Sequence, residues 1–310
     1  MNEPLVSVPV ITYNSSAYII KGLESIKAQT YKNIELIISD DCSTDNTVEL
    51  CRKWLNENGN RFTRTLLVTT EKNTGVAGNL NRAIRPAQGE WIKSLSGDDK
   101  FFPKTIQSYI DYVTSHPDCN IVFGKFKFFG DNDNLIRKNI AYYESRFYPK
   151  IKLDLQKQYI EILKEMFVPG PGLFFKKALY DEVGGYDERY PFCEEDPFMY
   201  KVIIEGRNRI HFFDNEVYGY CVRQDSLARE GKGKIINRHL ADRIRFYCDK
   251  RRKKQLEKHF YLYAFDETCL YNYWKSKDSN KKFLRIIYTL LLLISPIRYK
   301  EHICYFFSRK

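Results

Sequence analysis

Apolar and polar positions fall into blocks along the first hundred residues, and the blocks have the lengths of strands and helices. Runs rich in Val, Ile and Leu predict buried strands at residues 5–13, 34–40, 64–70 and 90–96. Helical spacing and capping residues predict intervening helices at residues 15–29, 48–55 and 77–85. Strand and helix alternate here at the spacing that is typical of a mostly parallel α/β sheet.

The pattern changes beyond the fourth predicted strand. Helices are predicted at residues 103–115, 179–187 and 197–206, and strands at residues 120–130, 170–175 and 217–224. Residues 136–159 are polar and aromatic with weak periodicity, and we expect an irregular insertion there. The chain after residue 237 is mostly helical in pattern and strongly basic.

Charge separates the chain into two parts. The formal net charge is +11, but residues 229–310 carry 21 Lys and Arg against 8 Asp and Glu, a net +13, which leaves residues 1–228 close to neutral. We therefore expect a folded body over residues 1–228 and a helical, basic C-terminal region over residues 229–310. Such a region implies an anionic neighbour, which is a membrane surface, a phosphate-bearing substrate or nucleic acid.

The longest apolar stretch, FLRIIYTLLLLISPI at residues 283–297, lies within this basic region. It falls short of the roughly 20 apolar residues that a membrane-spanning helix needs. Two interpretations stay open. The stretch is a helix lying in a membrane interface, with basic residues on both sides, or it packs on the protein body or on a second subunit of a homodimer.

Cysteine spacing and the N-terminus bear on the compartment. The eight cysteines include no C-x-x-C pair and have no clustered His beside them, which argues against a zinc site. The N-terminal sequence MNEPLVSVPV lacks the build of a signal peptide. We expect reduced thiols in the cytoplasm.

Polar groups follow three of the predicted strands at the point where each strand ends. They are Thr12-Tyr13-Asn14, Asp40-Asp41 and Gly97-Asp98-Asp99. In an open parallel sheet the carboxyl ends of the strands share one edge, where ligands bind. Adjacent carboxylates such as Asp98 and Asp99 are costly unless a cation neutralises them, and Mg²⁺ or Mn²⁺ takes one or two carboxylates plus substrate phosphates. The alternative is an acidic turn that caps the following helix.

Read together, these segments resemble family 2 glycosyltransferases. VSVPVITYN, QTYKNIELIISDDCSTDNT and EKNTGVAGNLNRAIRPAQGEWIKSLSGDDKFFP follow the order and spacing of that family's N-terminal signature. PGPGLFFKKALYDEVGGYDERY, PFCEEDPFMYKVIIEG and YGYCVRQDSLA resemble its later motifs. The likeness covers residues 6 to about 228. Departures are Pro9 within the first strand, Ser96 in place of a further Asp, and Leu80 in place of a frequent Arg.

The resemblance implies a GT-A fold, a Rossmann-like, mostly parallel sheet flanked by helices, with nucleotide-sugar binding over residues 1–103 and the acceptor side over residues 104–228. It implies a nucleoside-diphosphate-sugar donor, most often a UDP-sugar, and Mn²⁺ or Mg²⁺. The implied donor-binding residues are Thr12, Tyr13, Asn14, Asp41 with Asp40 beside it, Asn81, Asp98 and Arg223. Asp99 is the implied metal ligand, and Asp196, next to Glu195, is the implied general base.

The chemistry of sugar transfer with inversion suits these residue types. A carboxylate takes the proton of the acceptor hydroxyl, and a metal and an Arg stabilise the leaving diphosphate. Each of these residues could instead have a purely structural role. Asp41 would cap a helix, residues 194–196 would form an acidic first helical turn, and Arg223 would be a surface charge. Residues 228–235, basic and glycine-containing, are either a loop that closes on the diphosphate or a solvated loop.

We expect the acceptor to be a saccharide, lipid-diphosphate-linked, in cell-surface polysaccharide synthesis. The enzyme would then act at the inner face of the cell membrane and bind no nucleic acid. A nucleotidyltransferase of related fold and a non-catalytic protein that binds nucleotide sugar or nucleic acid are the alternatives. A nucleotidyltransferase would usually carry a glycine-rich, basic phosphate loop after the first strand, and the segment NSSAYIIKG at that place does not supply one. Release of UDP when acceptor is added would distinguish a glycosyltransferase from a non-catalytic binding protein.

Overall fold

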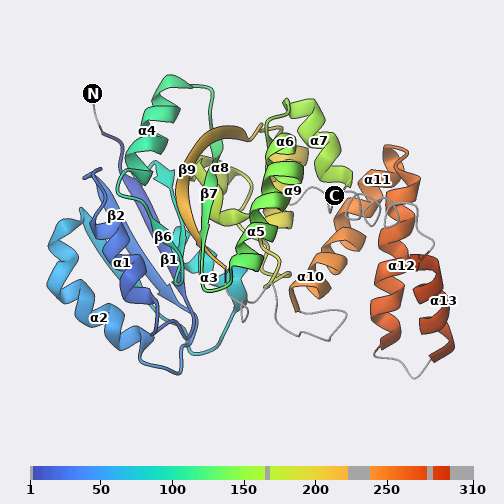
Figure 1. Cartoon of the computed structure of the whole chain (residues 1–310), viewed down its shortest axis with the longest axis horizontal. Helices are drawn as coiled ribbons and strands as arrows, with labels where there is room; N and C mark the ends of the chain where they lie inside the picture. Colours follow the sequence, from blue (N-terminus) through green and yellow to red (C-terminus); the bar gives the residue numbers. More distant parts are fainter. Residues whose placement is uncertain (1–2, 165–167, 223–237, 278–281, 294–310) are drawn as a thin grey trace. The chain divides into compact units, whose positions relative to one another are not determined.

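The computed structural model describes residues 3–164, 168–222, 238–277 and 282–293 (Figure 1). The chain forms two compact units, each of which is described by itself. The first comprises residues 1–162 and 166–226, and the second residues 163–165 and 227–310. The expected boundary at residue 228 lies outside the described residues.

A nine-stranded sheet runs through the first unit in the order β3-β2-β1-β4-β8-β7-β9-β6, with β5 also paired to β1. The strands are β1 Val6–Thr12, β2 Ile34–Asp40, β3 Arg64–Val68, β4 Trp91–Ile92, β5 Leu95–Ser96, β6 Lys100–Phe101, β7 Ile121–Phe129, β8 Leu173–Lys176 and β9 His211–Cys221. Pairings among β1 to β5 are parallel, while β4–β8, β7–β8 and β6–β9 are antiparallel. The prediction of a mostly parallel α/β sheet is confirmed for this N-terminal half.

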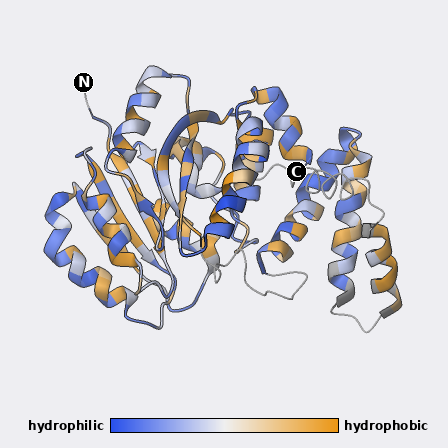
Figure 2. Ribbon diagram, in the orientation of Figure 1, coloured by the Kyte–Doolittle hydropathy of each residue, from blue (hydrophilic) through white to orange (hydrophobic). Residues whose placement is uncertain are grey.

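Three helices flank the parallel half of the sheet: α1 Ile19–Lys27, α2 Thr47–Asn58 and α3 Gly75–Ile84. α1 connects β1 to β2 and α2 connects β2 to β3, whereas α3 returns the chain from β3 to β4, on the far side of β1. β1 and β2 are buried almost throughout, because helices cover both faces. Apolar residues accordingly follow the central strands in Figure 2.

The fourth predicted strand is not continuous. Residues 90–96 form two short strands, β4 and β5, which pair with β1 on either side of a break at Lys93 and Ser94. Pro9 of β1 lies beside this break, since Ser7 pairs with Ile92 and Val10 with Leu95. Proline has no amide hydrogen to donate, so the ladder loses a bond at this point. The sequence prediction of one strand was therefore wrong, and the reason lies on the neighbouring strand.

The expected irregular insertion at residues 136–159 is instead helical. It contains α5 Asp133–Tyr142, a π-helical turn at Tyr143–Phe147, α6 Tyr148–Ile151 and the start of α7 Leu155–Lys164. Tyr143, Phe147 and Tyr148 are buried against the aromatic residues Phe123 and Phe126 of β7. The π turn shifts the helical phase, and this shift removes the regular apolar period that would have predicted a helix.

Other elements agree with their predictions apart from their ends. The remaining helices of this unit are α4 Thr105–Ser115, α8 Lys177–Glu182 and α9 Glu195–Tyr200. A π-helical turn at Lys201–Glu205 follows α9, and a 3-10 turn at Gly170–Gly172 precedes β8. The last strand begins at His211, six residues before its predicted start at Val217.

The second unit is helical within its described residues, as predicted. It contains α10 Arg238–Phe246, a π-helical turn at Tyr247–Arg251, α11 Arg252–Glu257, α12 Tyr261–Lys277 and α13 Lys282–Leu293. Arg251 and Glu267 form a buried ion pair in this unit. None of the helices seen in the described ranges combines the length and apolar character that crossing a bilayer requires. Residues 294–297 of the apolar stretch lie outside those ranges.

Candidate active site

Strand register brings the three predicted polar groups to one edge of the sheet. Thr12 of β1 lies opposite Asp40 of β2, and Ile11 lies opposite Ser96 of β5. The strand ends are therefore neighbours, although their residues are far apart in sequence. The edge is the carboxyl end of parallel strands, where α/β sheets bind ligands.

Hydrogen bonds tie the ends of β1 and β2 together. The Thr12 hydroxyl donates to Asp40 Oδ2 at 2.8 Å, and Asn14 Oδ1 accepts from the Thr44 amide at 2.8 Å. Asn14 and Cys42 both adopt left-handed backbone conformations, with φ of 47° and 68°. Such conformations are uncommon for residues other than glycine and cluster at functional sites. Tyr13, between these strand ends, is 51% exposed.

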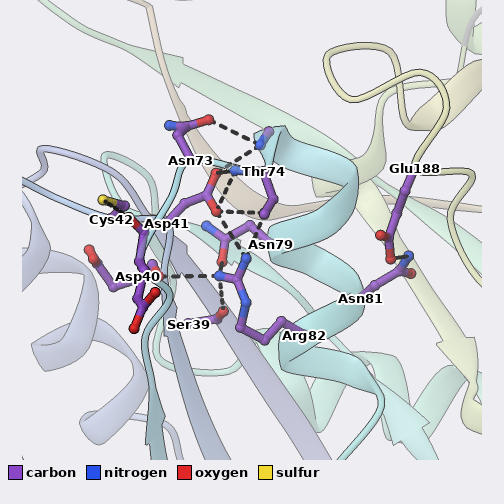
Figure 3. Close-up of polar contacts among 12 residues, drawn as sticks. Ser39, Asp40, Asp41, Cys42, Asn73, Thr74, Asn79, Asn81, Arg82 and Glu188 are labelled. Atoms are coloured by element: carbon purple, nitrogen blue, oxygen red, sulfur yellow. Dashed lines mark hydrogen bonds and ion pairs between the residues drawn. The ribbon is translucent and has the colours of Figure 1, made fainter.

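Asp41 is buried, and protein groups surround its carboxylate (Figure 3). The Thr74 amide donates to both oxygens at 3.0 Å, the Gly75 amide to Oδ2 at 2.8 Å, and the Thr74 hydroxyl to Oδ1 at 2.6 Å. The Arg82 guanidinium adds an ion pair at 3.0 Å. A carboxylate has about four lone-pair sites, so Asp41 is fully engaged in holding the start of α3. Its predicted contact with the base stays a prediction.

The predictions did not include Arg82. Its guanidinium donates to the Asp40 carbonyl at 3.2 Å and to the Thr74 hydroxyl at 2.6 Å, in addition to Asp41. The signal was present in the sequence, since Leu80 stands where the resembling family often has Arg, and a helix carries an arginine two residues later. The structure shows that this arginine reaches the strand ends.

Asn81 lies on another side of α3, away from Asp41 (Figure 3). Its side-chain amide donates to the Tyr186 carbonyl at 2.9 Å and to Glu188 at 2.7 Å, and its oxygen accepts from the Tyr180 hydroxyl at 2.6 Å. These bonds secure residues 180–188 to α3. The structure thus does not bring Asn81 together with the other predicted donor-binding residues.

The turn at residues 97–99 lies against the end of β1. A side chain at Gly97 would have its Cβ 2.8 Å from Ser15 Oγ, so the close approach of Ser15 favours glycine at this position. Asp98 is half-buried, and Asp99 is buried. The Asp99 carboxylate accepts from the Tyr218 hydroxyl and from the Cys221 amide, each at 2.7 Å.

The electrostatics of this turn are unfavourable to two negative charges. Burial and the neighbouring charge of Asp98 raise the pKa of Asp99 well above its ordinary value, although the Cys221 and Tyr218 bonds and the charge of Lys93 act against the rise. A bound cation would remove this penalty. The described residues contain no group of three or more His, Cys, Asp or Glu suited to a metal ion. Two adjacent carboxylates match the one or two protein ligands that Mg²⁺ or Mn²⁺ takes when substrate phosphates and water supply the others.

Glu195 and Asp196 begin α9, a few residues after Pro191. The Gly170 amide lies 3.5 Å from Glu195 Oε1, and the Ala77 amide of α3 donates to the carbonyl of Pro191. Asp196 is 5% exposed. Burial and the charge of Glu195 raise the pKa of Glu194 well above its ordinary value. Arg223 and residues 228–235 lie outside the described residues.

The fold and these strand-end carboxylates define the chain's class. Residues 7–183 match glycosyl transferase family 2, and the chain belongs to that family. The protein is a glycosyltransferase with a GT-A fold. A curated relative, the glycosyltransferase GlyG of Streptococcus pneumoniae serotype 4, is 33% identical over 233 residues, which are 73% of each chain. The chain spans less than half the length of several other curated relatives that it matches.

Solved structures share the fold. S. aureus TarS in complex with UDP-GlcNAc aligns over 92% of this chain and 79% of its own, with a TM-score of 0.63 and 20% identity. The mannosyltransferase PcManGT from Pyrobaculum calidifontis, in complex with GDP-Man and Mn²⁺, aligns over 96% of this chain and 83% of its own, with a TM-score of 0.60 and 19% identity.

Proposed function

We propose that this glycosyltransferase moves a sugar from a nucleoside-diphosphate sugar, with a UDP-sugar as the first candidate, to a hydroxyl of a saccharide acceptor. One observation carries the proposal. The strand register gathers Thr12, Asp40 and the turn at Asp98 and Asp99 on one edge, and burial and the charge of Asp98 raise the pKa of Asp99 in this turn. The ligands of TarS and PcManGT, UDP-GlcNAc in one and GDP-Man with Mn²⁺ in the other, support the donor class and a divalent metal.

On the donor side, we propose that the nucleoside lies over the end of β1, where Tyr13 is exposed and Thr12 is fixed by Asp40. Asp41 and Arg82 hold the first turn of α3 beside it. The resemblance implies Asp99 as the metal ligand, and that assignment stays a prediction. Because the Asp99 carboxylate accepts from Tyr218 and Cys221, we propose instead that Asp98, the more accessible of the adjacent acids, binds the metal while Asp99 anchors the turn. A bound Mg²⁺ or Mn²⁺ would supply positive charge to the leaving diphosphate.

On the acceptor side, Asp196 is the proposed general base, with Glu195 beside it. A single displacement with inversion needs one base within reach of the acceptor hydroxyl and no enzyme nucleophile. The N-terminal position of both residues on α9 favours their negative charge.

The acceptor and its location form the finer part of the proposal. Exposed apolar side chains at Phe283, Ile286 and Leu290 recur on α13, at the spacing of one helix face, within a region of net charge +13. This pattern supports an acceptor that is linked to a lipid diphosphate and a protein that works on an anionic membrane surface. Removal of residues 281–310 should then abolish retention on anionic vesicles, and unchanged retention would refute the membrane part alone.

The decisive experiment on function compares Asp196→Asn with the wild type. Nucleoside-diphosphate release would be measured with a panel of sugar donors and Mn²⁺, with and without saccharide acceptors. We expect Asp196→Asn to lower acceptor-dependent release by about 10³-fold while nucleotide binding stays the same. Asp133→Asn, on α5, is the matched control and should have no effect. Loss of nucleotide binding with unchanged transfer would contradict the role of Asp196 as base.

A further inference from the structure

A buried lysine lies at the break between β4 and β5. Lys93 is 0% exposed, and its ammonium donates to the carbonyl of Pro171 and, at 3.2 Å, to the carbonyl of Leu173. The same ammonium lies 4.5 Å from the ring centroid of Tyr218 and 5.4 Å from that of Phe101. Burial lowers the pKa of Lys93 well below its ordinary value, although the charge of Asp99 acts against this fall. Among the described residues no carboxylate lies within ion-pair distance of Lys93.

The partners of this ammonium lead to the acidic turn. The Tyr218 hydroxyl accepts from the Ser96 amide at 3.4 Å and donates to Asp99 Oδ2 at 2.7 Å. Phe101 belongs to β6, which leaves the turn and pairs with Tyr218 and Gly219 of β9. The ring face of Tyr218 thus rests on a cation while its hydroxyl holds a carboxylate.

The same ammonium also leads to the acceptor side. Pro171 belongs to the 3-10 turn at Gly170–Gly172, and Leu173 begins β8. The amide of Gly170 in that turn lies 3.5 Å from Glu195 Oε1. The Lys93 side chain therefore contacts the turn at residues 170–172, which lies beside Glu195. It also contacts Tyr218, which donates to Asp99.

We propose that Lys93 is a positioning residue: its ammonium holds Tyr218 and the segment at residues 170–173 in place, so that the turn at Asp98 and Asp99 keeps the geometry that binds the metal and donor diphosphate. The inference rests on the proposed function for its last step only. Lys93 touches neither substrate nor metal, and it acts through Tyr218 and Asp99. Its positive charge also lowers the cost of a negatively charged turn before the cation arrives.

Hydrogen exchange of the protein without ligand tests the positioning directly. In Lys93→Met, which keeps the unbranched shape of the side chain but removes its terminal amine, we expect exchange in peptides that carry residues 97–101 and the Cys221 amide to accelerate about tenfold. Tyr218→Phe, which removes one hydroxyl, should do the same, while peptides from β2 exchange as in the wild type. Lys176→Met, which alters a lysine above the ring of Trp91 on the same sheet, is the control and should change neither.

Calorimetric titration of the same variants with UDP and Mn²⁺ measures their nucleotide affinity and is the second test. We expect about tenfold weaker binding in Lys93→Met and Tyr218→Phe, with the double variant no weaker than either single one. Wild-type exchange at residues 97–101 in Lys93→Met, or a general acceleration over the whole unit, would overturn the inference. If Lys93→Met does not fold, the exchange of Tyr218→Phe decides. Failure of the wild type to bind any nucleotide would count against the proposed function, and the exchange data would still decide the role of Lys93.

Discussion

Asp41 and Asp99 are both buried carboxylates beyond the ends of β2 and β5, two strands that each pair with β1, yet their surroundings differ. Asp41 receives two backbone amides, a hydroxyl and the guanidinium of Arg82. Asp99 receives one amide and one phenol, has Asp98 beside it, and its pKa is raised by burial and by that neighbour. One carboxylate is neutralised within the fold, and the other is not.

The difference separates a carboxylate that stabilises the fold from a pair of carboxylates that binds a ligand. A carboxylate whose partners are all protein groups stabilises the fold and gains nothing from a ligand. Adjacent carboxylates that repel each other gain free energy when a cation arrives, and this gain contributes to binding. The region around Asp41 is therefore the frame of the donor site, and the turn at Asp98 and Asp99 is the part that responds to the donor and metal.

The largest expected effect is on turnover. Asp98→Asn removes the accessible charge of the acidic turn, and we expect sugar transfer to fall by about 10²- to 10³-fold, as it does when one stabilising group is removed from developing charge. Steady-state nucleotide release at saturating Mn²⁺ measures it. Turnover within about twofold of the wild type would show that this turn does not respond to the donor.

The next effect is on stability, at the other carboxylate. Asp41→Ala leaves Arg82 and the amides of Thr74 and Gly75 without their partner, and we expect the free energy of unfolding to fall by about 3 kcal/mol. Denaturant titration of the ligand-free protein measures this change. Asp98→Asn serves as the comparison and should not destabilise the protein. Equal losses in both variants would erase the proposed distinction.

The pH dependence of binding separates the regions further. A raised pKa in the folded state means that Asp99 favours folding at low pH, below its unfolded pKa of about 3.9, and that this contribution is lost as pH rises through the folded value. A metal needs the deprotonated form, so affinity for Mn²⁺ with UDP should increase with pH, by at most about tenfold per unit, until the pair is ionised. Calorimetry between acid and neutral pH measures this slope, and affinity that is flat with pH would contradict it.

The smallest effect concerns the shape of the frame. Arg82→Lys keeps the positive charge near Asp41 but loses the fork that also reaches the Asp40 carbonyl and the Thr74 hydroxyl. We expect a loss of about 1 kcal/mol in unfolding free energy with little change in turnover. Thermal unfolding and the release assay measure both quantities. A large loss of turnover would place Arg82 in contact with the donor instead.

The parallel half of the fold was predictable from sequence because its strands are buried on both faces. The prediction at residues 34–40 coincides with β2, and the polar groups at the strand ends followed from it. The insertion at residues 136–159 was not predictable, because a π turn breaks its period and its stability comes from aromatic contacts with β7. Pro9 acts on the strand beside it, which a strand-by-strand interpretation does not capture.

The site was predictable as a set of residue types but not as an arrangement. Sequence spacing placed Asp41, Asp98 and Asp99 at strand ends, yet it cannot tell which carboxylate meets an arginine and which a phenol. Those partners, Arg82 and Tyr218, come from distant parts of the chain. Lys93 carried a signal of its own, since a charged residue within an apolar strand is unusual, and the structure shows what it contacts.

The most direct test is calorimetric titration of UDP into the wild type and Asp98→Asn, each with Mn²⁺ and with a chelator. We expect Mn²⁺ to strengthen nucleotide binding to the wild type by at least about tenfold. Asp98→Asn should remove this gain and leave metal-free binding unchanged. Equal strengthening in both proteins, or nucleotide binding to the wild type that ignores the metal, would contradict it.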